Sequence, residues 1–342
     1  MTRRMITQKI QIVLALVLLM AAAFSAGNSF TNTAFAPFMS DNRADIANNK
    51  SAISSKTADA PAANAQPIIS EKPGASNVDE SASEITVSSE DPSIHMDDSD
   101  IYHGSLILVN QDHRYEIPET EDFIAVSGVK TPSYKVADTE MVLSSSIIEP
   151  LNEMMDAFYA ETGNDMVTIR SAFRSYELQQ NTFNEYVLLV GRIEATRWAS
   201  LPGYSEHHTG LAFDFGIDAD GEVKSFTNVG ANTWFVRNSW RYGFILRFPS
   251  DKTSITKTAY EPWHFRYVGK PHSYIIFINN WCFEEYIEVL MGYSRDEPYT
   301  ATYEDSYYEI YYTQDTEIDI PPDREIDISG NNIDGYIVTM KY

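Results

Sequence analysis

The sequence predicts a fold of the α+β class, in which helices surround a small antiparallel sheet and a small β appendage follows at the C-terminus. Helix-type and strand-type patterns mix irregularly over residues 101–292, without the regular strand–helix alternation that predicts a parallel sheet. From residue 293 onward, short alternating patterns separated by turn sequences replace them. Apolar residues make up 43% of the 342 residues, which suits a globular core over part of the chain.

The first 27 residues have the layout of an export signal. Arg3, Arg4 and Lys9 precede an apolar run at residues 10–24, and small residues follow it. This run is slightly short for a full membrane span, so a cleaved signal peptide and an uncleaved membrane anchor both remain open. In either case we expect the rest of the chain to be extracytoplasmic, either secreted or anchored to the membrane.

Residues 28–100 are expected to form a disordered, acidic linker. They are rich in Ser, Ala, Asn, Asp and Pro and contain few aromatic residues, so they cannot bury enough apolar surface to fold alone. The formal charge of the whole chain is −24. Such an acidic surface argues against nucleic-acid binding, because phosphates attract basic surfaces.

Residues 101–292 are expected to form the main domain. Residues 104–118 contain two strand-like runs with a turn between them. Residues 144–163 and 175–191 have helical periodicity, and each of these two segments ends on a glycine. The other expected elements are strands over residues 166–170, 210–216, 244–249 and 263–269, and helices over residues 233–243, 271–281 and 283–292.

Residues 293–342 are expected to form an acidic, Tyr-rich β appendage. Polar residues alternate with apolar or aromatic ones over residues 303–322 and 324–342, and the sequences GNN and DG are turn signals. Between residues 296 and 342 there are twelve acids and two bases, so this segment carries a large part of the negative charge. Packing between strands is the simplest explanation of its tyrosines.

The run SEHHTGLAFD, residues 205–214, places two of the seven histidines side by side. In a strand, Gly210 and Ala212 would share the face of Asp214, and aromatic residues would occupy the other face. A buried carboxylate needs a partner, and the small residues beside it leave room for a ligand. A metal ion would be such a partner.

A second motif, YEPWHFRYVG at residues 260–269, supplies a further histidine and a further acid. We predict that His207, Asp214 and His264 bind one Zn²⁺ and leave the fourth position to water. Glu261 would then take the proton of that water. The mixed nitrogen and oxygen ligands suit Zn²⁺, although Fe²⁺ or Co²⁺ could occupy the same site.

These motifs resemble those of VanY-type D-alanyl-D-alanine carboxypeptidases, which are zinc peptidases of the group that includes hedgehog-like and LAS-type peptidoglycan enzymes. Residues 205–214 match the family pattern Ser-x-His-x-x-Gly-x-Ala-x-Asp, and residues 261–264 match Glu-x-Trp-His. The segment SAFRSYELQQ, residues 171–180, resembles the Arg-Ser-Tyr segment of the family. The likeness covers residues 120–292, so the N-terminal linker and the last fifty residues lie outside it.

The resemblance implies a D,D-carboxypeptidase that removes the terminal D-Ala from peptidoglycan stem peptides, by attack of a zinc-bound water with Glu261 as the base. It implies one zinc ion per chain, with the two histidines and the aspartate as ligands. Arg174 would be both catalytic and substrate-binding, because a planar, permanently charged guanidinium can stabilise an oxyanion or hold a peptide carboxylate. Further substrate contacts are expected from Ser205, Tyr176 and Gln180. We expect a monomer at the cell wall, whose partner is the peptidoglycan stem peptide and which contacts the membrane only if the N-terminal segment is uncleaved.

Several alternatives remain at this stage. An L,D-carboxypeptidase or a peptidoglycan endopeptidase would share every ligand, and a non-catalytic wall-binding module would share the fold but would not need Glu261. Arg174 could instead form an ion pair that fixes the start of a helix, and Ser205 or Tyr176 could be capping residues. His208 is expected to lie behind the ligands or on the surface.

Overall fold

The structure is a computed structural model, and it describes residues 93–342 except residues 119–121 and 323. They belong to one compact unit, Glu84–Tyr342. The predicted signal segment, residues 1–27, and most of the predicted linker lie outside the described residues. None of the helices in the described part of the chain has the length and the apolar character that a membrane span requires.

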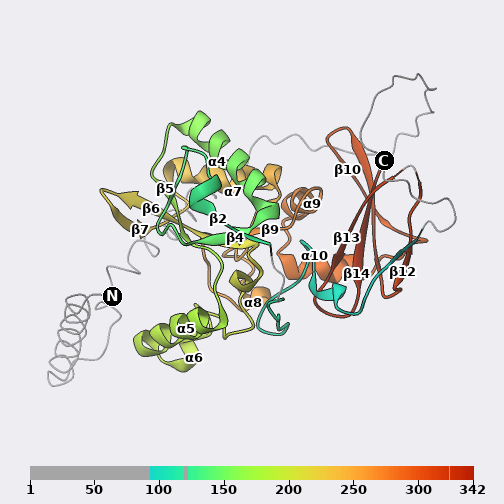
Figure 1. The fold of residues 1–342 in the computed structure, drawn as a ribbon, viewed down its shortest axis with the longest axis horizontal. Helices are drawn as coiled ribbons and strands as arrows, with labels where there is room; N and C mark the ends of the chain where they lie inside the picture. Colours follow the sequence, from blue (N-terminus) through green and yellow to red (C-terminus); the bar gives the residue numbers. More distant parts are fainter. Residues whose placement is uncertain (1–92, 119–121, 323) are drawn as a thin grey trace. The chain divides into compact units, whose positions relative to one another are not determined.

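The predicted α+β class is confirmed, with a central sheet of six strands (Figure 1). Its order is β3–β5–β6–β9–β8, with β7 paired to β6. The β3–β5 pair is parallel and the other pairs are antiparallel, so the sheet is mixed rather than purely antiparallel as predicted. The strands are β3 (Lys135–Val136), β5 (Val167–Ser171), β6 (Ala212–Ala219), β7 (Glu222–Ser225), β8 (Phe244–Leu246) and β9 (His264–Tyr267).

Helices surround this sheet, and in Figure 1 α5 and α6 lie side by side. The longer helices are α4 (Ile148–Thr162), α5 (Tyr176–Val190), α9 (His272–Asn279) and α10 (Phe283–Leu290). The shorter ones are α3 (Val126–Val129), α6 (Arg192–Ala195), α7 (Thr233–Asn238) and α8 (Thr253–Thr256). Short 3₁₀ turns are η1 (Asp100–Tyr102), η2 (Ser145–Ile147), η3 (Glu206–Thr209), η4 (Gly230–Asn232) and η5 (Ser239–Tyr242). A separate two-stranded ladder joins β2 (Phe123–Ala125) to β4 (Val142–Ser144).

The ends of the two long helices follow from their sequence. α4 stops where Gly163 takes a left-handed backbone with φ +66°, which glycine adopts without steric cost. α5 starts where the Ser175 side chain accepts a hydrogen bond from the Leu178 backbone N–H, and it ends at Gly191. Both predicted helices are therefore confirmed, with their predicted glycine stops.

An aromatic cluster behind β6 forms the centre of the main core. Phe213 and Phe215 are fully buried, and the ring of Phe215 lies 5.3 Å from that of Phe265 and 4.7 Å from that of Phe235. Burying a side chain of this size stabilises the fold by roughly 1.5–3 kcal/mol. The aromatic face of β6 is thus anchored in the core, which fixes the direction in which its other face points.

Residues 104–118 were predicted to contain strands, and this prediction is wrong. Residues 106–109 are all buried, but they form no ladder with a neighbouring strand. Their backbone instead bonds to residues near the C-terminus: the Leu106 N–H donates to Ser329 Oγ (2.9 Å) and the Leu108 N–H to the Asn331 carbonyl (3.1 Å). An apolar run can therefore be buried as irregular chain when side chains and loop carbonyls satisfy its backbone.

The C-terminal residues form a four-stranded antiparallel sheet in the order β10–β11–β14–β13, as expected of the β appendage. These strands are β10 (Tyr299–Tyr303), β11 (Ser306–Thr313), β13 (Glu325–Gly330) and β14 (Tyr336–Lys341). The sheet shares a hydrophobic core with α9 and α10, so packing continues across the predicted boundary at residue 293. A further strand, β12 (Glu317–Asp319), pairs with β1 (Ser93–His95), which lies inside the predicted linker.

The turn before β6 leaves no room for a side chain at Gly210. Its φ is +67°, and an added Cβ would lie 2.5 Å from Cε1 of Phe123 and 2.9 Å from the backbone nitrogen of Ser144. Gly163 has almost the same φ, +66°, but open space around it. We expect Gly163→Ala to lower the free energy of unfolding by about 1–3 kcal/mol through backbone strain, and Gly210→Ala by about 1–3 kcal/mol more through crowding.

Urea denaturation of the two variants and the unmodified chain measures this difference. Equal losses of unfolding free energy in the two variants would show that the contacts of Gly210 do not matter.

Candidate active site

Three predicted ligands, His207, Asp214 and His264, come together from three elements. Asp214 lies on β6 directly opposite His264, the first residue of β9, in the antiparallel register. His207 lies in η3, and the left-handed Gly210 turns the chain from η3 into β6. One nitrogen or oxygen atom from each of the three lies within 4.8 Å of the others. Residues 50 positions apart in the sequence thus share one site.

The ligand atoms converge on one point. Asp214 Oδ1 is 3.0 Å from His264 Nδ1 and 3.3 Å from His207 Nε2. The two imidazole rings are almost perpendicular, with an interplanar angle of 86°. All three residues are buried, which shields the site from bulk water.

This geometry fits a zinc ion. Zn–N and Zn–O bonds of about 2.0–2.1 Å at a tetrahedral angle place two ligand atoms about 3.3 Å apart. The two measured separations from Asp214 Oδ1 lie close to this value. His207 Nδ1 donates a hydrogen bond to the Ala172 carbonyl (2.7 Å), so its Nε2 lone pair faces the site. Two imidazole nitrogens and one carboxylate oxygen leave one tetrahedral position for a water or substrate oxygen.

Burial and charge separate the pKa values of the three ligands. Burial, with the Arg174 guanidinium, lowers the pKa of His207 to about 4. Burial alone would also lower the pKa of His264, but hydrogen bonds to Asp214 and Glu206 outweigh it and raise the pKa to about 9. Burial favours a neutral Asp214, but both histidines and Arg174 hold its pKa well below the usual range. Without metal at neutral pH, His264 is therefore protonated and Asp214 is ionised.

Glu261 lies beside the ligands, as the sequence predicted. Its Oε2 is 3.7 Å from His264 Nδ1, and its side chain is buried. Burial, with the negative charges of Asp214 and Glu206, raises the pKa of Glu261 to about 8. This carboxyl group can therefore bind and release a proton near neutral pH.

Comparisons with known proteins agree with this site. Residues 140–270 match the family model VanY, D-alanyl-D-alanine carboxypeptidase. A D-alanyl-D-alanine carboxypeptidase of Enterococcus faecium is 33% identical over 248 residues, which cover 70% of this chain and 76% of that protein. The chain belongs to the VanY family of D-alanyl-D-alanine carboxypeptidases. It is a zinc peptidase acting on D-Ala-D-Ala, and the predicted cofactor is confirmed.

Solved structures include relatives of this VanY-family enzyme. The vancomycin-resistance D,D-dipeptidase VanXYg, in complex with a D-Ala-D-Ala phosphinate analogue, has a TM-score of 0.65 and 30% sequence identity. That match covers 73% of this chain and 98% of VanXYg. A VanY D,D-pentapeptidase variant from a VanB-type resistance cassette, in complex with Zn(II), is also 30% identical, with a TM-score of 0.45 over 54% of this chain and 98% of that one.

Arg174 of this VanY-family enzyme contacts the metal site directly. Its Nη2 donates to Asp214 Oδ2 at 2.8 Å, its Nε to Ser171 Oγ at 3.0 Å and its Nη1 to Gln179 Oε1 at 3.2 Å. The ion pair weighed as an alternative is therefore present, but it is made with a metal ligand. Among the described residues these acceptors use one N–H on each nitrogen, which leaves one N–H on Nη1 and one on Nη2.

The other predicted substrate contacts, Ser205, Tyr176 and Gln180, differ in their burial and hydrogen bonds. Ser205 is buried just before η3 and makes no side-chain cap hydrogen bond there. The Tyr176 hydroxyl is engaged elsewhere, since it donates to the Tyr115 carbonyl (2.9 Å) and accepts from the Ile117 N–H (3.1 Å). Gln180 does not lie at the site: it is exposed on α5 and bonds to Asn184.

Gln179, the neighbour of Gln180, is the glutamine at the site. It is fully buried, accepts from Arg174 and donates to the Ser200 carbonyl at 2.7 Å. Burial, with the carboxylates of Glu261 and Asp214, raises the pKa of Tyr186, which lies seven positions further along α5. The seven-residue spacing of one helix face could have pointed to both residues.

His208 lies behind the site and not on the surface. It is fully buried, its Nδ1 donates to the Arg174 carbonyl (2.6 Å) and its Nε2 accepts from the Gly203 N–H (2.9 Å). Its ring also packs against Tyr176 at 4.8 Å. His208 therefore positions the backbone of Arg174. Sequence reasoning missed the acid just before the two histidines, Glu206, whose Oε2 is 3.3 Å from His264 Nε2.

Zinc binding should release a proton near neutral pH. With a pKa of about 9, His264 is protonated in the metal-free site at pH 6–8, so zinc must displace that proton. The zinc Kd should therefore fall about tenfold for each unit of pH increase over this range. Competition titrations with a chelator at pH 6, 7 and 8, corrected for the chelator's own protonation, measure the slope. A Kd that does not change with pH would contradict the protonated state of His264.

Proposed function

We propose that this VanY-family carboxypeptidase removes the terminal D-Ala from peptidoglycan stem peptides outside the cytoplasm, with Glu261 as the general base. The observation that carries the proposal is a buried glutamate 3.7 Å from a metal ligand, whose pKa is raised to about 8. A protein that only bound the cell wall would have no use for such a group. The N-terminal basic and apolar segment at residues 3–24 supports export.

Each group at the site has a distinct task in peptide hydrolysis. A bound zinc ion supplies a Lewis acid for the scissile carbonyl and lowers the pKa of water to about 7. Glu261 accepts the proton of the attacking water at its carboxylate and then donates it to the nitrogen of the leaving D-Ala. Burial raises the pKa of Glu261 and so favours uptake of a proton by its carboxylate, which suits a group that takes up a proton and passes it on.

Arg174 has two N–H groups left for the substrate, as described above. They can bind the oxyanion that forms at the attacked carbonyl, or the free carboxylate at the end of the peptide. Hydrogen bonds to Ser171 and Gln179 hold the guanidinium in place before substrate binds. Such a pre-oriented donor favours the transition state, because no reorganisation is needed during the reaction.

Release of amino acids from synthetic stem peptides tests this function. The zinc-loaded full chain is incubated with a pentapeptide ending in D-Ala-D-Ala and with the corresponding tetrapeptide, with and without EDTA. EDTA-sensitive release of D-Ala from the pentapeptide is expected. Preference for the tetrapeptide would move the enzyme to the L,D class. No release from either peptide, with zinc demonstrably bound, would leave an endopeptidase or a binding module.

The role of Glu261 is tested with Glu261→Gln, which keeps the shape of the side chain but cannot accept a proton. Loss of a general base typically lowers the rate by about 10²–10⁴-fold, so kcat on the pentapeptide should fall in this range while zinc stays bound. Glu288→Gln is the matched control, because Glu288 is an exposed acid on α10. A Glu261→Gln enzyme with unchanged kcat, measured with equal zinc content, would rule out this base.

A further inference from the structure

Glu206 is a buried acid that the reaction does not use. Its side chain is almost fully buried, and it lies next to His207 in η3 but contacts the other histidine ligand. Its Oε2 is 3.3 Å from His264 Nε2. The Nδ1 atom of the same ring faces Asp214 Oδ1 at 3.0 Å, so Glu206 and the metal site lie on opposite edges of one imidazole.

Two fully buried arginines hold the other carboxylate oxygen of Glu206. Arg247 Nε donates to Oε1 at 2.7 Å and Arg266 Nη1 donates to the same oxygen at 3.0 Å. Because Oε1 is occupied by two guanidinium groups, Oε2 is the oxygen that faces His264. A carboxylate only accepts hydrogen bonds, so the Nε2 atom of His264 must carry a proton in this arrangement.

Each arginine is itself anchored by segments outside the metal-binding strands. Arg266 Nη2 donates to the carbonyls of Ser105 (2.9 Å) and Ile107 (3.0 Å). Arg247 donates from Nη1 and Nη2 to the two carboxylate oxygens of Glu284 on α10, at 2.8 and 2.6 Å. The guanidinium groups therefore have a fixed orientation, which a single ion pair would not impose.

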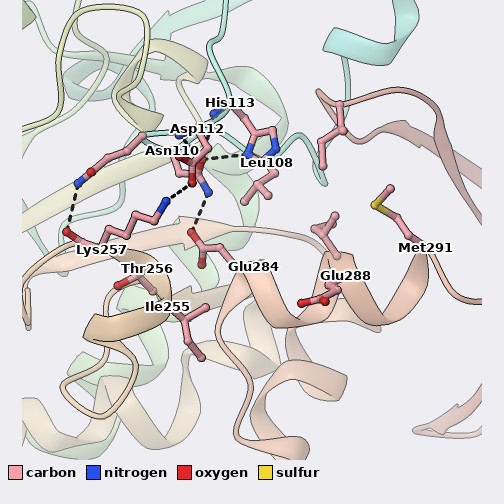
Figure 2. A pocket seen from close by; sticks show the side chains of 13 residues that line it. Leu108, Asn110, Asp112, His113, Ile255, Thr256, Lys257, Glu284, Glu288 and Met291 are labelled. Atoms are coloured by element: carbon pink, nitrogen blue, oxygen red, sulfur yellow. Dashed lines mark hydrogen bonds and ion pairs between the residues drawn. The ribbon is translucent and has the colours of Figure 1, made fainter.

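Residues 105–110 contact both Arg266 and Glu284, the acid that holds Arg247. Asn110 Nδ2 donates to Glu284 Oε1 at 3.1 Å, and Figure 2 shows this contact at the wall of a cavity of about 320 Å³. The C-terminal sheet in turn holds this segment, through the Leu106 and Leu108 contacts described above and through Asn332 Nδ2, which donates to the Leu108 carbonyl at 2.8 Å. A continuous set of polar contacts thus links the C-terminal region to His264.

We propose that Glu206 is a positioning residue for the zinc ligand His264. It accepts the Nε2–H of the ring, so that the Nδ1 lone pair is presented to the metal beside Asp214 Oδ1. Arg247 and Arg266 keep the carboxylate in this orientation. A carboxylate behind a histidine ligand fixes its tautomer and raises its basicity. The inference rests on the zinc site of the proposed function and not on the identity of the peptide that is cleaved.

A purely structural role for this network makes a different prediction. Buried ion pairs contribute little net stability compared with well-packed apolar residues, but removing one partner is destabilising. If Glu206 served folding alone, any loss of charge from the network would lower stability and leave zinc binding unchanged. The comparison of two acids in the network, Glu206 and Glu284, separates these roles, because only Glu206 touches His264.

The decisive variant is Glu206→Gln in the full chain. The amide oxygen can still accept from the arginines, but the amide N–H group then faces the Nε2–H of His264. We expect the zinc Kd to rise about 10–100-fold, as is typical when the hydrogen-bond partner of a ligand is lost. The absorption bands of the Co²⁺-substituted protein should also shift. Glu284→Gln, the matched control, should lower Tm but keep the zinc Kd and the Co²⁺ spectrum of the unmodified chain.

Two outcomes would overturn the proposal. One is a Glu206→Gln protein with unchanged zinc Kd and Co²⁺ spectrum, and the other is an equal loss of zinc affinity in both variants. If Glu206→Gln does not fold, long-range ¹H–¹⁵N NMR of the zinc-loaded unmodified chain decides the question. Nε2 of His264 should carry the proton and Nδ1 should bind the metal. The reverse assignment would exclude Glu206 as the acceptor. None of these readouts depends on peptide hydrolysis, so they can fail independently of the proposed reaction.

Discussion

The antiparallel pairing of β6 with β9 is the constraint on which the site depends. It sets Asp214 opposite His264, while the buried aromatic rings of Phe213, Phe215 and Phe265 fix which face of each strand points inward. A slip of β6 by one residue relative to β9 would turn the side chain of Asp214 into the aromatic core, on the opposite face of the sheet from His264. The register is therefore protected by hydrophobic packing, although the residues that use it are polar. Gly210 completes the arrangement by bringing His207 back over the same face.

Three buried carboxylates within this small region have different tasks because they have different neighbours. Burial favours the neutral form of each, but both histidines and Arg174 keep Asp214 ionised, and Arg247 and Arg266 keep Glu206 ionised. Glu261 has no arginine within ion-pair distance among the described residues, and its pKa is raised. Asp214 is thus suited to bind a metal, Glu206 is suited to accept a hydrogen bond from the metal ligand His264, and Glu261 is suited to transfer a proton.

The C-terminal sheet is more than an attachment to the enzyme. It shares a hydrophobic core with α9 and α10, and buried His272 on α9 bonds to Tyr286 on α10 (2.7 Å) and Thr339 on β14 (3.2 Å). It also holds the irregular segment at residues 105–110, which supports Arg266 and Glu284. Residues outside the 140–270 family match therefore take part in fixing the metal-binding strands.

The α+β class, the long helices with their glycine stops and the metal triad could all be predicted from the sequence, because period and motif spacing are local properties of the chain. The position of residues 104–118 could not be read from it, since an apolar run does not show whether a strand or a loop will satisfy its backbone. Side-chain direction within a turn has no such period either. The tertiary structure was needed to show which face of α5 meets the site, and that face carries Gln179 and not Gln180. It was also needed to join Glu206 to two arginines 41 and 60 positions away. Those contacts exist because burial forces charged groups to find partners wherever the fold brings them together.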